Sequence, residues 1–136
     1  MRYRSSLFFG VMGMDNLRSR VNRWLPVFLW MGFIFFLSSQ PHLPRYPHPR
    51  IDFFLKKAAH LLEYAVLAIL LHRAVGNEGG WRALLMGGLY AASDEFHQSF
   101  VPGRNGELLD LAFDILGVVL GLYVARMVIS PKGRSC

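Results

Sequence analysis

Polar side chains that can bind ions or transfer protons recur at helical spacing in three places along this chain. The later members of each group lie three, four or seven residues after its first member, so each group falls on one face of a helix. The groups are Lys57, His60 and Tyr64; Asp94, His97 and Gln98; and Asp110 and Asp114. Two further carboxylates, Glu63 and Glu95, lie beside the first and second groups but are turned away from their faces.

One chemistry that these residue types support is metal binding or proton transfer. The candidate metal ligands are His60 and His97 together with Asp94, Glu95 or Asp114, because imidazole nitrogen and carboxylate oxygen both bind divalent metals. A histidine paired with a carboxylate can also act as a general acid or base. The sequence therefore leaves a divalent metal open, although it predicts no cofactor firmly.

A second chemistry is recognition of a phosphate-bearing headgroup without turnover. Arg104 can grip a phosphate through two parallel hydrogen bonds, whereas Lys57 offers a point charge. Asp94, Glu95 and Asp110 would then hold these cations or accept hydrogen bonds from hydroxyl groups. We favour this binding role over catalysis.

Four apolar stretches must position these residues: 24–39, 58–75, 81–100 and 108–129. The last spans about 33 Å as a helix, enough to cross a hydrocarbon core of roughly 30 Å. The chain is 53% hydrophobic and only 18% charged. Together these features predict an all-α integral membrane bundle of about four transmembrane helices.

The segments between the apolar stretches set the predicted domain organisation. Residues 40–50 contain four prolines, which predicts that no helix forms there. Glycine-rich turns are expected at 76–80 and 101–106. We expect a basic N-terminal arm over 1–23, a membrane domain over 24–129 and a short tail over 130–136, with either Met1 or Met14 as the start.

The charge distribution argues for a membrane and against nucleic acid. The net charge is +6, but the basic residues lie in the gaps between apolar stretches rather than along one face. Ten Lys and Arg residues fall on the side that holds both termini and five on the other. The positive-inside rule then predicts cytoplasmic termini and an outward-facing polar end.

Other features narrow the function classes further. Cys136 is the single cysteine, which excludes an intrachain disulfide and a cysteine metal site. Gly117 and Gly121, four residues apart, are expected to let two helices approach closely. The polar groups themselves remain open to a purely structural role, in which Asp94 with Arg104, or Glu63 with Lys57, form ion pairs that hold the bundle together.

One long motif makes the chain resemble a known family. The motif is Ser93-Asp94-Glu95-x-His97-Gln98-x-Phe100-x-Pro102-Gly103-Arg104, flanked by K-x-x-H-x-x-x-Y at 57–64 and D-x-x-x-D-x-x-G at 110–117. With these motifs the chain resembles the VanZ-like family over roughly residues 25–125. Many members carry Asn where this chain has Asp114. The resemblance implies a small multi-pass protein of the bacterial cell membrane, whose namesake is linked to teicoplanin resistance.

The sequence therefore predicts an outward-facing polar site that recognises a membrane lipid or a lipid-linked envelope precursor and affects glycopeptide or lipoglycopeptide sensitivity. The alternatives are an intramembrane enzyme that uses a metal or a His–carboxylate pair on a lipid, and a purely structural or interaction subunit. The oligomeric state stays open. The candidate site residues are Lys57, His60, Tyr64, Asp94, Glu95, His97, Gln98, Arg104, Asp110 and Asp114.

Overall fold

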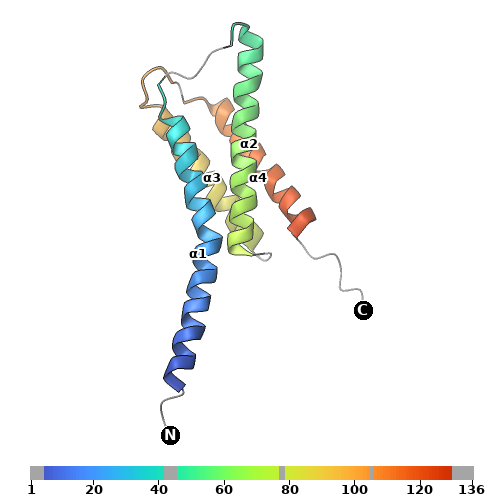
Figure 1. Cartoon of the computed structure of the whole chain (residues 1–136). Helices are drawn as coiled ribbons and strands as arrows, with labels where there is room; N and C mark the ends of the chain where they lie inside the picture. The colour runs from blue at the N-terminus through green and yellow to red at the C-terminus, as the bar shows by residue number, and fades with distance from the viewer. Residues whose placement is uncertain (1–4, 42–45, 77–78, 105, 130–136) are drawn as a thin grey trace.

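The computed structural model describes residues 5–41, 46–76, 79–104 and 106–129, with side chains from Asn16 onward. Within these ranges all of the regular secondary structure is helical, which confirms the predicted all-α class. The helices are α1 (Ser5–Ser38), α2 (Pro49–Val75), α3 (Gly80–Gln98) and α4 (Leu108–Ile129). Successive helices run in opposite directions, so α1 begins and α4 ends at the same end of the bundle (Figure 1).

The first helix is longer than the apolar stretch that predicted it. Residues 5–23, expected as a separate basic arm, form one continuous helix with the span that follows. Its N-terminal part extends beyond the other three helices (Figure 1). The portion Asn16–Ser38 is long and apolar enough to cross a membrane.

The second helix corrects the prediction that residues 40–50 contain no helix. It begins at Pro49, nine residues before the predicted start. Proline suits the first helical position because its missing N–H would have no partner there and its fixed φ already matches the helix. At the other end Gly76 adopts a φ of 84° and donates its N–H to the carbonyl of His72, which ends the helix at the predicted glycine turn.

The close packing of α2 on α4 forms the centre of the bundle. α2 also contacts α1 and α3. Gly117 and Gly121 of α4 are buried against the backbone carbonyls of Leu61 and Ala65 on α2. A side chain at either glycine would overlap that backbone, so the pair acts as the predicted packing device.

The distribution of polar and apolar residues is inverted relative to a water-soluble protein. Asp114 is fully buried, and Lys57 and Asp94 are only 6% and 4% exposed, whereas Leu89 is 63% exposed. Lysine and aspartate are almost never buried in soluble domains unless they are paired. Large apolar surfaces of this extent mark contact with lipid or with other proteins. By length and composition, α4 also qualifies to cross a membrane.

Candidate functional site

Asp94 joins three helices through a single oxygen atom. Its Oδ2 accepts hydrogen bonds from Ser38 Oγ of α1 at 2.8 Å, from the Tyr64 hydroxyl of α2 at 3.2 Å and from Gln98 Nε2 at 3.0 Å. The other oxygen, Oδ1, is buried and accepts no hydrogen bond from the described residues. The predicted faces of 57–64 and 94–98 therefore do meet, at the end of α1.

Arg104 anchors the loop before α4 to the end of α1. Its guanidinium donates to the carbonyls of Leu37 and Gln40, at 2.9 and 3.3 Å, and to Gln98 Oε1 at 3.1 Å. All three acceptors are neutral. Among the described residues, no carboxylate lies within ion-pair distance of Arg104, so the Asp94–Arg104 pair weighed from the sequence does not form.

Lys57 is held by the start of α4. Its ammonium group donates to Asp110 and lies 3.4 Å from Glu107 Oε2. The side chain is only 7% exposed. Glu107 was missed by the sequence reasoning, although an acidic residue just before a helix start was an available signal. Lys57 is thus neutralised within the bundle and does not pair with Glu63.

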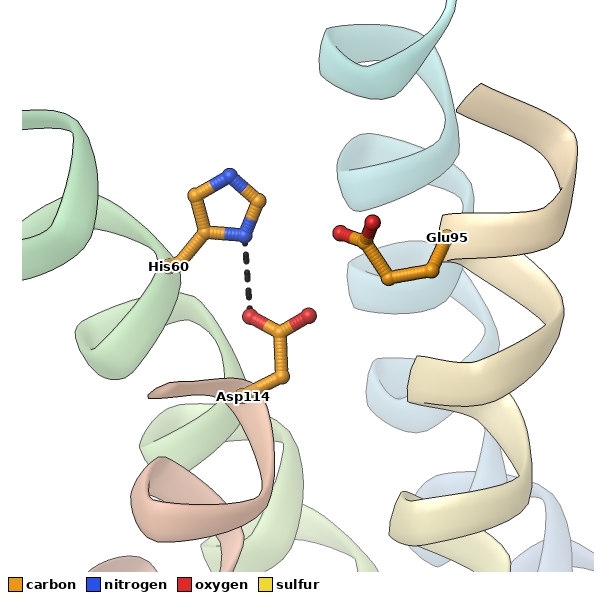
Figure 2. A group of neighbouring side chains, drawn as sticks. All are labelled: His60, Glu95 and Asp114. Carbon is orange, nitrogen blue, oxygen red and sulfur yellow. Dashed lines mark hydrogen bonds and ion pairs between the residues drawn. The ribbon is translucent and has the colours of Figure 1, made fainter. Parts of the chain in front are cut away.

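A third group brings α2, α3 and α4 together. His60 Nδ1 lies 2.9 Å from Asp114 Oδ1, and Glu95 extends its carboxylate toward both from α3 (Figure 2). One donor atom from each of the three residues lies within 4.8 Å of the others. Asp114 Oδ2 and Glu95 Oε1 are buried without a hydrogen-bond partner in the described part of the chain.

A cavity of about 820 Å³ opens beside these groups, at the end of the bundle where α1 ends and α2 begins. Its wall carries apolar residues together with charged ones. The polar and charged residues that line it are Ser38, Asp52, Lys56, Lys57, His60, Glu63, Gln98, Arg104, Glu107 and Asp110. Its size falls within the range of pockets that hold small molecules, roughly 300–1,000 Å³.

His97 is the predicted site residue that lies apart from the rest. Its ring stacks on Phe35 with centroids 4.6 Å apart, and its Nε2 lies 3.2 Å from Ser39 Oγ. Of the candidate metal ligands, His60 converges with Glu95 and Asp114, whereas His97 and Asp94 lie apart from this group. Adjacent residues of α3 point to different neighbours, Asp94 toward α1 and α2 and Glu95 toward α4, and helical spacing alone does not choose between them.

The comparisons with known proteins agree with the resemblance drawn from the motifs. A family model described as VanZ/LLP1 matches residues 23–129, which includes all three motifs and every residue of the site. No curated protein and no solved structure matches the chain. The match covers well over half of the sequence, and the chain therefore belongs to the VanZ/LLP1 family.

Proposed function

We propose that this protein binds the phosphate-bearing headgroup of a membrane lipid or lipid-linked envelope precursor in the cavity at the end of the bundle. The observation that carries the proposal is Arg104, whose guanidinium lines the cavity yet is held only by neutral acceptors. A phosphate would supply the missing negative charge and accept two parallel hydrogen bonds.

The second polar feature of the cavity is Glu63. Its carboxylate forms no hydrogen bond or ion pair with the described residues, although its backbone carbonyl accepts from Trp30 Nε1 at 2.9 Å. A carboxylate without a hydrogen-bond partner near a guanidinium that has only neutral acceptors suits a headgroup that carries hydroxyl or amino groups beside its phosphate. Lys57, which the sequence also assigned to phosphate, is neutralised by Asp110 and Glu107 and supports the cavity wall instead.

The proposal includes a multi-pass arrangement in the bacterial membrane. The inverted distribution of polar and apolar residues supports immersion of all four helices, and the excess of Lys and Arg on the side of the termini supports cytoplasmic ends. The cavity then opens toward the outer face, where lipid-linked envelope precursors and glycopeptide antibiotics meet. Apolar residues such as Leu37 and Phe53 in its wall are suited to the first part of an acyl or isoprenoid chain.

Lipid binding by Arg104 variants tests the proposal. Purified full-length protein is titrated with undecaprenyl phosphate, and separately with phosphatidylglycerol, and bound lipid is counted by native mass spectrometry. Loss of a charge-assisted contact costs about 1.5–3 kcal/mol, so Arg104→Gln should weaken binding roughly tenfold or more. Preference for one of the two lipids identifies the source of the phosphate.

The matched control is Arg73→Gln. Arg73 also donates to a backbone carbonyl, that of Asn22 at 3.0 Å, but it lies near the other end of α2. It should leave binding unchanged. Arg104→Lys keeps the positive charge but cannot form two parallel hydrogen bonds to a phosphate, so it should bind the lipid with intermediate affinity. Equal binding by folded wild-type protein and Arg104→Gln would overturn the proposal, and a parallel fall in protein level and function would favour the structural-subunit alternative.

Sensitivity to teicoplanin provides the cellular prediction. If the protein binds an envelope precursor, its production should change the teicoplanin concentration that inhibits growth, and Arg104→Gln should remove that change at equal protein level. The measurement is the inhibitory concentration with membrane-localised protein quantified in parallel. If wild type and Arg104→Gln change the inhibitory concentration equally, the effect on teicoplanin sensitivity does not depend on phosphate binding in the cavity.

A further inference from the structure

A second feature lies deeper than the headgroup cavity, among His60, Glu95 and Asp114. His60 lines the cavity, whereas the two carboxylates, on α3 and α4, are not among the described residues that line it. Glu95 is 8% exposed and Asp114 is fully buried. Each keeps one oxygen without a hydrogen-bond partner among the described residues. Two acceptors buried in this way indicate that the site lacks a positively charged component.

The charges around the three residues also favour a positively charged group between them. A protonated His60 offsets at most one of the two carboxylates, and the nearby cation Lys57 is committed to Asp110 and Glu107. A buried negative charge without a partner is costly. We infer that His60, Glu95 and Asp114 bind a divalent transition-metal ion, with Zn²⁺ the better fit and Mn²⁺ the alternative. This inference does not depend on the proposed lipid binding.

The donor set and its geometry suit such an ion. One imidazole nitrogen and two carboxylate oxygens form a mixed set that Zn²⁺ and Mn²⁺ accept, whereas Mg²⁺ and Ca²⁺ prefer oxygen alone. The three donor atoms lie within 4.8 Å of one another. Zn²⁺ ligand distances of about 2.0–2.2 Å place tetrahedral donors roughly 3.4 Å apart, so small side-chain rotations would close the site.

Neighbouring contacts already orient part of this set. Glu95 Oε2 accepts the backbone N–H of Glu107 at 3.1 Å, and the Glu95 carboxylate extends toward Asp114 and His60 (Figure 2). Such outer contacts fix ligands in metal sites. Three protein ligands leave a fourth position for water or another ligand, as in zinc sites that are not purely structural. Because His60 lines the cavity, this fourth position would lie next to the cavity.

Titration with Zn²⁺ tests the inference. The full-length protein, stripped with a chelator in mild detergent, is titrated with Zn²⁺ and then with Mn²⁺ by isothermal calorimetry. One ion should bind per chain. His60→Gln, Glu95→Gln and Asp114→Asn should each weaken binding at least tenfold, because loss of a ligand costs no less than loss of an outer contact, about 10–100-fold.

Two controls make the result specific. His97→Gln removes a histidine of α3 that lies outside the group, and Arg73→Gln removes a cation near the other end of α2; both should bind Zn²⁺ like wild type. Co²⁺ added to wild-type protein provides a readout that needs no variant, since a site with histidine and carboxylate ligands gives a visible absorption band that Zn²⁺ abolishes. Absence of binding and of this band in wild type, or equal affinity in folded Asp114→Asn, would overturn the inference.

Discussion

At the residue scale, the bundle satisfies buried polar atoms with partners from other helices. Asp94 is the clearest case, because one oxygen accepts from Ser38, Tyr64 and Gln98 on three helices. Helical spacing predicts that these residues share faces, but not that Asp94 is the acceptor common to all. Gln98 serves two purposes here, since its Nε2 donates to Asp94 and its Oε1 accepts from Arg104 at the cavity wall.

Removing the Asp94 carboxylate should destabilise the protein strongly. Asp94→Ala leaves three buried donors without their acceptor, and an unsatisfied buried group costs about 1–3 kcal/mol. We expect a clearly lower melting temperature in detergent, and a smaller decrease for Asp94→Asn, which keeps one acceptor oxygen. The measurement is thermal unfolding followed by circular dichroism.

Ser93→Ala is the control for that experiment. Ser93 is exposed, and its hydroxyl donates only to the carbonyl of Tyr90 in its own helix. Its replacement should change the melting temperature little. If Ser93→Ala lowers the melting temperature as much as Asp94→Ala does, this part of α3 tolerates no substitution. The loss of stability in Asp94→Ala could then not be attributed to its three hydrogen-bond donors.

At the element scale, the helix boundaries and contacts follow from local chemistry and from close approach. Pro49 begins α2 well before the apolar stretch, and the basic arm before Trp24 continues into α1. Apolar runs mark where lipid contact is expected, but they do not mark where a helix begins. The small residues of α4, by contrast, do indicate the face that packs against α2.

Glycine substitutions should separate packing from helix propensity. Gly121→Ala places a methyl group against the Ala65 backbone, and overpacking of this kind costs about 1–3 kcal/mol. Gly88→Ala meets nothing within 4 Å and should be neutral or stabilising, by up to about 1 kcal/mol. Unfolding of both variants in detergent checks the difference. Equal stability would mean that α2 and α4 shift apart at no cost.

At the scale of the whole molecule, the alternating helices place the polar groups at one end of the bundle. The end of α1, the N-terminal half of α2, the end of α3 and the start of α4 meet there, and the start of α1 and the end of α4 lie at the other end (Figure 1). The same arrangement places the cavity and the His60 group on one common side of the bundle, which we propose to be the outer face.

Cysteine labelling tests that orientation in intact cells. Cys136 is the only cysteine and should react with a membrane-impermeant maleimide only after the cells are opened. Ser99→Cys in a Cys136→Ser background places a thiol at the exposed end of α3 and should react in intact cells. The reverse pattern would place the cavity in the cytoplasm and exclude an outward-facing site.

The sequence by itself determined the helical class, the approximate spans, the family motifs and the side on which polar residues gather. Periodicity and turn residues are local signals, and both survive in the structure except at Pro49, where a helix begins inside the predicted proline-rich turn. Only the tertiary structure decided which side chains meet: Lys57 with Asp110 and Glu107, and, of the ligands that the sequence left open, His60 with Asp114 and Glu95 but not with His97 or Asp94. The physical reason is that helical spacing defines a face within one helix, whereas the rotation of that face toward its neighbours depends on how the helices pack, here through the close contact of α4 glycines with α2.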